Sequence, residues 1–175
     1  MFASTQVDPA VLAAHRSQDG RTLAEFCNGN FVFLVFLRHF GCTFCREAVA
    51  EIAQKRSSIE ARGVSLAFVH LGTEEKAQWF FTHYGLTDVP RFGDPEAHLY
   101  QAFGLSRAKL GQYLNPESIR RSIGAFFHGH FIGFPAGEIE RMPGVFLMQG
   151  TEIRKSFRHQ LVSDRPDYLA LANPA

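Results

Sequence analysis

The chain has 175 residues, of which 46% are hydrophobic and 20% charged, and its formal net charge is +1. These values fit one globular domain with a substantial core and exclude a disordered or fibrous protein. The near-neutral charge offers no basic surface to nucleic acid, and no apolar run approaches the roughly 20 residues that a membrane-spanning helix needs.

The first residues of the chain carry charges and prolines where a secretory signal needs a continuous apolar segment, so we expect a cytoplasmic protein. Its three cysteines are too few for a disulfide scaffold. In the cytoplasm, a closely spaced pair such as Cys42 and Cys45 is more typical of redox or metal chemistry. Cys27 stands apart, either as an incidental buried residue or as a distant resolving thiol.

The first predicted elements lead to one strand that is apolar throughout. Asp8-Pro9 begins a short helix, and Thr22 to Phe26 forms an irregular connection or a second short helix. Phe31 to Leu37 shows no alternation, which indicates a strand covered on both faces at the centre of a parallel sheet. After the turn that Gly41 permits, Thr43 to Glu60 has the apolar spacing of a helix.

The next segments continue a parallel sheet. Val64 to Leu71 is a mostly apolar strand, and a strand, a helix and a strand in this order predict a right-handed crossover. Thr73 has the character of an N-cap and opens a second long helix. Val89 to Phe92 is expected as a short edge strand because proline is tolerated there, and Asp94-Pro95 begins another helix.

The last part of the chain is expected to hold an insertion and then to complete the sheet. Residues 105–144, with a helix at 116–123, would pack over the sheet. Val145 to Gln149 and Ile153 to Phe157 predict an antiparallel hairpin, and a short helix follows at Asp167 to Leu171. We therefore predict one α/β domain, residues 1–175, with parallel central strands, a C-terminal antiparallel hairpin and flanking helices.

The turn after the apolar strand carries the chemistry. Cys42 is expected at a helix N-terminus, where unpaired N–H groups and the helix dipole lower the pKa of a thiol from its usual value of about 8.5. Cys45, one turn on, is placed to attack a mixed disulfide at Cys42 and to close the intramolecular disulfide. Two ordinary core cysteines, or half of a zinc site, are the alternatives. No second cysteine pair accompanies this one, so we expect no metal and no cofactor.

Four sequence features lie between Asn30 and His159. They are Phe36-Leu-Arg-His-Phe-Gly-Cys-Thr-Phe-Cys-Arg-Glu47, Asp94-Pro-x-x-x-Leu-Tyr-x-x-Phe-Gly-Leu105, Gly137, and Pro143-Gly-Val-Phe-Leu147. Together they resemble the peroxiredoxin-like AhpC/TSA-type antioxidant family of the thioredoxin-like superfamily. The resemblance implies a thioredoxin-like mixed sheet and a C-x-x-C redox centre. It also implies a peroxide or disulfide substrate and an external thiol reductant, either of the thioredoxin type or glutathione, and it allows a homodimer.

The cysteine pair sits in a setting that differs from typical peroxiredoxins, which have a Thr three residues and a Pro seven residues before the reactive cysteine. Relative to Cys42, these positions are His39 and Val35. Relative to Cys45, they are Cys42 and Arg38. We therefore expect a thiol–disulfide oxidoreductase or an atypical thiol peroxidase that cycles through a Cys42–Cys45 disulfide. The alternative is a non-catalytic redox-sensing or binding domain on the same scaffold.

Five further residues are expected to support the pair. Functional groups of open α/β sheets gather at the carboxyl ends of the parallel strands, where His39 and His70 lie. Each is either a base or thiolate stabiliser, or a solvated or capping histidine. Arg38 and Arg46 would lower a thiol pKa or bind an anion, unless they are solvated surface residues. Pro143 precedes the penultimate strand, and the resemblance to thioredoxin-like proteins implies a cis peptide bond there.

Overall fold

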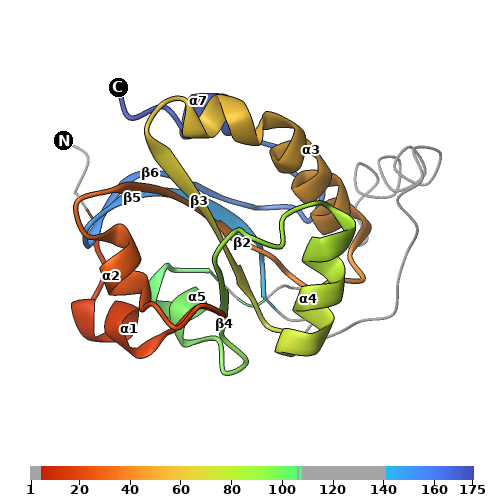
Figure 1. Cartoon of the computed structure of the whole chain (residues 1–175), viewed down its shortest axis with the longest axis horizontal. Coiled ribbons are helices and arrows are strands. Elements are labelled where there is room, and N and C mark those ends of the chain that lie inside the picture. Colours follow the sequence, from red (N-terminus) through yellow and green to blue (C-terminus); the bar gives the residue numbers. More distant parts are fainter. Residues whose placement is uncertain (1–4, 106, 108–140) are drawn as a thin grey trace.

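The computed structural model describes residues 5–105, 107 and 141–175 (Figure 1). Within these residues, six strands form one sheet in the order β1-β6-β5-β2-β3-β4. The strands are β1 (Thr5–Gln6), β2 (Phe31–Phe36), β3 (Val64–His70), β4 (Arg91–Gly93), β5 (Gly144–Gln149) and β6 (Glu152–Arg158). The helices are α1 (Pro9–Ala14), α2 (Leu23–Cys27), α3 (Thr43–Glu60), α4 (Glu74–His83), α5 (His98–Ala102) and α7 (Tyr168–Leu171).

The pairing of the strands confirms the predicted fold class. β2, β3 and β4 run parallel, whereas β5 pairs antiparallel with both β2 and β6. β2 lies inside the sheet and β4 lies at its edge, as the sequence indicates. β1 was not expected, because its two residues are too few to leave a sequence pattern; they pair with β6. Most of the expected insertion, including the helix at 116–123, lies outside the described residues.

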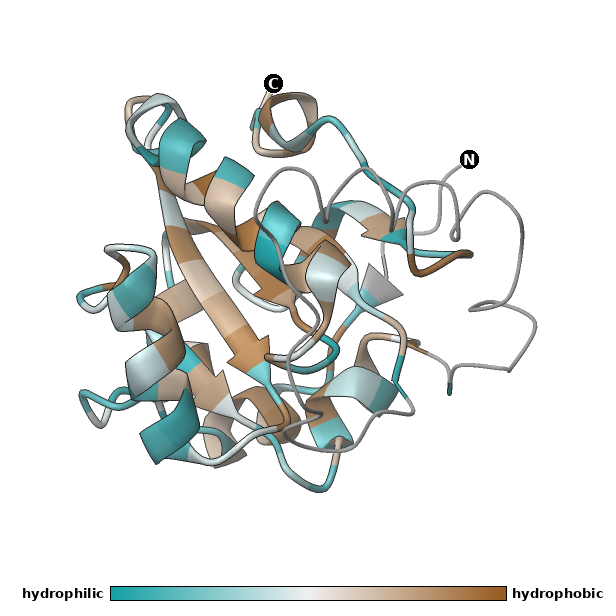
Figure 2. Ribbon diagram, turned by 90° about the vertical axis from the view of Figure 1, so that its right-hand side faces the viewer, coloured by the Kyte–Doolittle hydropathy of each residue, from teal (hydrophilic) through white to brown (hydrophobic). Residues whose placement is uncertain are grey.

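Helices cover both faces of the sheet, which explains why β2 is apolar throughout. Phe33 and Val35 belong to the core cluster under α3, α4 and α7, whereas Val32 and Leu34 belong to the cluster under α1, α2 and α5. Figure 2 shows strands of mainly hydrophobic residues and, around them, helices that carry both hydrophobic and hydrophilic residues. None of the described helices is long and apolar enough to cross a membrane.

The helix expected from Asp94 begins four residues later, at His98. The reason is that the Asp94 carboxylate caps the helix from a distance, accepting the backbone N–H groups of His98 (2.9 Å) and Leu99 (2.8 Å). Ala97 occupies the N-cap position in a left-handed conformation, with a φ of 60°. The polar residue was therefore a correct signal for a helix start, but the turn between it and the helix is longer than the sequence suggested.

The expected cis bond before Pro143 is wrong, because the described residues contain no cis peptide bond. A trans X–Pro bond is favoured by about 0.5–1 kcal/mol unless its surroundings select the other isomer. Pro143 is nevertheless buried at the start of β5, and its carbonyl accepts the backbone N–H of His159 at 3.3 Å.

The start of β5 requires a glycine for steric reasons. A Cβ at Gly144 would lie 2.6 Å from Leu105 Cδ2 and 3.0 Å from Phe146 Cε2. We therefore expect Gly144→Ala to lower the free energy of unfolding by about 1–3 kcal/mol through overpacking. Gly93→Ala is the matched control, since its Cβ would make only an ordinary contact 3.6 Å from His70. Urea denaturation measures both, and equal stability of the two variants would contradict this packing account.

Candidate functional site at the start of helix α3

The cysteine pair lies where the central strand passes into α3. The Leu37 N–H donates to the carbonyl of Val69 (2.9 Å), which extends the β2–β3 pairing by one residue. The Cys42 N–H then donates to the carbonyl of His39 (3.1 Å) and closes the turn. Cys42 is the N-cap of α3, and its carbonyl accepts the N–H of Arg46 (3.0 Å). Cys42 therefore lies at a helix N-terminus, as the sequence predicts.

Both thiols are free and nearly inaccessible, with exposed fractions of 6% for Cys42 and 4% for Cys45. They belong to the apolar cluster under α3, α4 and α7. The backbone N–H of Arg38 donates to Cys45 Sγ at 3.4 Å. Cys27 is also buried, but it belongs to the cluster on the opposite face of the sheet, and burial raises the pKa of its thiol to about 12. Its position favours the interpretation of Cys27 as an incidental core residue.

The surroundings shift the pKa values of the two thiols in opposite directions. The pKa of the Cys42 thiol is lowered chiefly by the Cys45 thiol as a hydrogen-bond donor, and also by the charge of Arg38 and by the N–H groups of Cys45 and Phe44. These effects outweigh burial, which raises the pKa of Cys42. The pKa of Cys45 is raised well above its ordinary value by its hydrogen bond to Cys42 and by burial. Cys42 is therefore the preferred thiolate of the pair.

Arg38 and His39 form a buried pair beside the cysteines. Arg38 Nη2 lies 2.6 Å from His39 Nε2, and since a guanidinium only donates, His39 Nε2 accepts this hydrogen bond. Burial, followed by the charges of Arg38 and Arg46, lowers the pKa of His39 to about 4. The imidazole is therefore neutral at pH 7, and its accepting nitrogen is occupied by the guanidinium that it orients.

The side chains of Arg46 and His70 make their hydrogen bonds to backbone carbonyls. Arg46 Nε donates to the carbonyl of Phe40 (2.9 Å) and ties the turn to the first turn of α3. The ring of His70 packs 5.4 Å from that of Phe40, and its Nδ1–H donates to the carbonyl of Gly72 (3.0 Å). Burial lowers the pKa of His70 to about 4. The ring of Phe40, two residues before Cys42, thus contacts His70, which the sequence predicts at the same rim of the sheet as the cysteine pair.

A mainly apolar cavity adjoins Cys45. Its lining comes from the end of β2, the first turns of α3, the start of β5 and the segment after β6. The lining includes Phe44, Ala48, Pro143, Val145, Val162 and Tyr168. His159 also lines the cavity, and burial lowers the pKa of this histidine to about 4. At the polar part of the lining, Arg165 Nη1 pairs with Glu47 Oε1 at 2.7 Å.

Sequence reasoning missed His159 and Arg165. His159 directly follows the last strand, and a polar residue at a strand end was a usable signal. Arg165 left no signal, because its partners Glu47 and Glu51 lie more than 100 residues earlier in the chain.

A mixed sheet with parallel central strands, antiparallel C-terminal strands and flanking helices is a thioredoxin-like fold. Among solved structures, the chain is similar to reduced Prx3 in complex with H2O2 from Vibrio vulnificus. That match has a TM-score of 0.70 and 14% identity, and it covers 99% of this chain and 100% of the other. The bacterioferritin comigratory protein of Xanthomonas campestris gives a TM-score of 0.64 at 12% identity, covering 91% of this chain and 90% of the other.

Residues 8–148 match the model of the AhpC/TSA family, and the chain belongs to that family. Two curated relatives share shorter stretches. The chloroplastic thioredoxin-like protein AAED1 of Arabidopsis thaliana is 38% identical over 47 residues, which are 27% of this chain and 19% of that protein. Prostamide/prostaglandin F synthase of Salmo salar is 34% identical over 76 residues, 43% of this chain and 37% of that protein. The chain thus matches less than two fifths of the length of either relative.

The hydrogen bond between the two thiols gives a matched pair of variants. We expect Cys45→Ala to raise the pKa of Cys42, because the donor that lowers it most is lost. Cys45→Ser keeps an O–H donor and should raise the pKa less. The rate of Cys42 alkylation by iodoacetamide as a function of pH, read by peptide mass spectrometry, measures both shifts. An unchanged pKa in Cys45→Ala would show that the partner thiol has no part in ionising Cys42.

Proposed function

We propose that this chain is a thiol peroxidase in which Cys42 reduces a peroxide and Cys45 resolves the oxidised product as a disulfide. The observation that carries the proposal is the preferred ionisation of Cys42 at the N-cap of α3, next to a protonated Cys45, in a chain of the AhpC/TSA family. A thiolate is the nucleophilic form of cysteine, and a thiol one turn away is the group that a resolving step requires.

The proposed cycle has three balanced steps. The Cys42 thiolate attacks one peroxide oxygen of ROOH, the O–O bond breaks, and the leaving RO⁻ takes a proton to become ROH, which leaves Cys42 as sulfenic acid. The Cys45 sulfur then attacks the Cys42 sulfur, and water leaves as the Cys42–Cys45 disulfide forms. Two electrons and two protons from an external dithiol of the thioredoxin type, or from two molecules of glutathione, restore both thiols.

Arg38 is the residue best placed to assist the first step. Its guanidinium is buried beside the pair, its charge favours the Cys42 thiolate, and it is a donor for a peroxide oxygen on which negative charge develops. His39 holds this guanidinium through Nε2, so we assign His39 a positioning role. Arg46 supports the turn through the Phe40 carbonyl, and Pro143 forms part of the cavity wall.

Two observations favour a second assignment of roles within the same activity. The apolar cavity is lined by Cys45, and the Arg38 N–H donates to Cys45 Sγ. In this assignment Cys45 attacks the peroxide and Cys42 resolves. Cysteine variants distinguish the two assignments, because only the attacking cysteine forms a sulfenic acid when its partner is absent. The non-catalytic redox-sensing alternative has no feature of the site in its favour beyond the pair itself.

Peroxide oxidation of the reduced protein tests the proposal. We expect one equivalent of hydroperoxide to consume two thiols per chain and to produce a Cys42–Cys45 disulfide. In Cys45→Ser, a dimedone adduct should form at Cys42, whereas Cys42→Ser should react no faster than a free cysteine. Cys27→Ser is the matched control and should behave as the unsubstituted protein, since Cys27 lies across the sheet.

The outcomes of this experiment distinguish the two role assignments and the alternative functions. A dimedone adduct at Cys45 in Cys42→Ser would exchange the roles of the two cysteines but keep the peroxidase. Reaction of the unsubstituted protein at the rate of free cysteine would contradict peroxidase function. Turnover of a small disulfide in that case would favour a thiol–disulfide oxidoreductase, and no turnover of either substrate would favour the redox-sensing domain.

In the second assignment, in which Cys45 attacks the peroxide, the apolar cavity beside Cys45 favours organic hydroperoxides over H2O2 as substrates. We expect Ala48→Phe, which would fill the cavity, to lower kcat/KM for cumene hydroperoxide on the order of tenfold more than kcat/KM for H2O2. Gln54→Phe is the matched control, because Gln54 is exposed on α3 and does not line the cavity. Equal losses for both substrates in Ala48→Phe would contradict a role of the cavity in substrate selection.

A further inference from the structure

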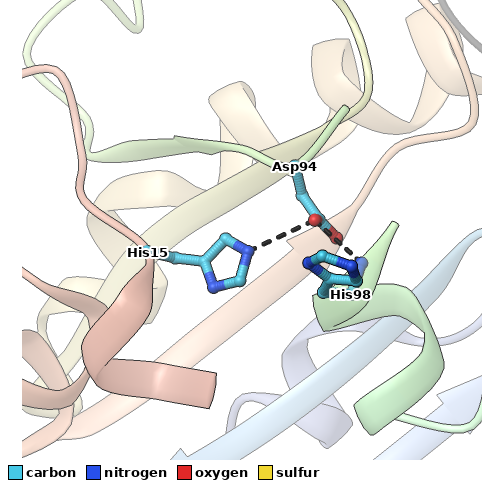
Figure 3. Close-up of side chains that lie close together, drawn as sticks. All are labelled: His15, Asp94 and His98. Carbon is cyan, nitrogen blue, oxygen red and sulfur yellow. Dashed lines mark hydrogen bonds and ion pairs between the residues drawn. The ribbon is translucent and has the colours of Figure 1, made fainter. Parts of the chain in front are cut away.

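Three side chains that can bind metal ions meet on the opposite face of the sheet from the cysteine pair. Among the described residues, one ligand atom each from His15, Asp94 and His98 lies within 4.8 Å of the other two. His15 follows α1, Asp94 follows β4, and His98 opens α5 (Figure 3). The cluster therefore joins segments that are far apart in the sequence, and the cycle proposed for Cys42 and Cys45 does not use it.

Asp94 is rigidly held and keeps an acceptor position toward His15. Its side chain is 1% exposed, Oδ2 accepts the N–H of Leu99, and Oδ1 accepts the N–H of His98. A carboxylate oxygen has two acceptor positions. The second one on Oδ1 faces His15 Nε2 at 3.2 Å.

The hydrogen bond of His15 to the backbone indicates which ring nitrogen faces Asp94. Its Nδ1 lies 2.8 Å from the carbonyl of Val11, which can only accept, so the proton of a neutral imidazole is on Nδ1. In that tautomer Nε2 presents a lone pair to Asp94 Oδ1 at 3.2 Å, an arrangement in which both atoms can act as ligands to one cation. A backbone carbonyl that accepts the other ring N–H is the usual partner of a metal-binding histidine.

The geometry suits a small divalent ion. Two ligand atoms bound to Zn²⁺ at about 2.0–2.1 Å in a tetrahedral arrangement lie about 3.3 Å apart, close to the separation of His15 Nε2 and Asp94 Oδ1. The His98 side chain is 58% exposed and can turn toward them. A water molecule can take the fourth position.

We propose that His15, Asp94 and His98 bind one divalent metal ion with nitrogen and oxygen ligands, for which Zn²⁺ is the best-fitting member. The ion would link the end of α1 to the segment between β4 and α5. It would therefore act as a cross-link that fastens the N-terminal helices to the edge of the sheet, independently of the redox chemistry.

The test must remove the cysteine pair as a competing zinc site, so it uses the full chain carrying Cys42→Ser and Cys45→Ser. After chelator treatment and removal of the chelator, calorimetric titration with Zn²⁺ should show one ion per chain, and bound Zn²⁺ should raise Tm. His98→Ala should weaken the affinity at least tenfold without loss of folding, because this side chain is exposed. His83→Ala, at an exposed histidine of α4, is the matched control and should bind as tightly as the parent.

Two results would overturn the proposal. The first is no saturable Zn²⁺ binding by the parent. The second is binding of equal affinity in His98→Ala. Either result would contradict a metal site formed by these three side chains.

Discussion

The segment between β2 and α3 must stabilise a thiolate at Cys42 against the cost of burying it. Burial opposes a thiolate at Cys42, and the N-terminus of α3, the Cys45 thiol and the charge of Arg38 together outweigh it. All of these groups are delivered by one continuous segment that leaves β2, turns at Gly41 and enters α3. The apolar layers on both faces of β2 fix that segment and keep water away from it.

A side chain from the opposite face of the sheet contacts the ends of β2 and β3. Tyr100 of α5 is fully buried, and its hydroxyl reaches the backbone carbonyls of Leu37 and Val69 at the ends of β2 and β3. The carboxylate of Asp94 caps the helix that carries Tyr100. The Asp94 cluster thus supports, from the opposite face, the strand end that continues into Arg38. The proposed metal ion would strengthen this support without contacting the cysteines.

Much of the framework could be predicted from the sequence, because local rules decide it. The unbroken apolar run of β2, the bounds of α3 at Thr43 and Glu60, and the hairpin of β5 and β6 all follow from patterning and turn residues. The pairing of Arg38 with His39, the burial of His70 against Phe40, and the contacts of Arg165 depend on packing between segments. No local pattern contains that information, and the trans bond before Pro143 shows that a resemblance does not supply it either.

We infer that Cys42 is the thiolate of the reduced protein at neutral pH. Thiolate absorbance in the ultraviolet, followed by pH titration of the reduced protein and of Cys42→Ser, measures it most directly. We expect a titration step well below the ordinary pKa of about 8.5 that is present in the unsubstituted protein and absent from Cys42→Ser. A step at or above the ordinary value, or one that persists in Cys42→Ser, would contradict it.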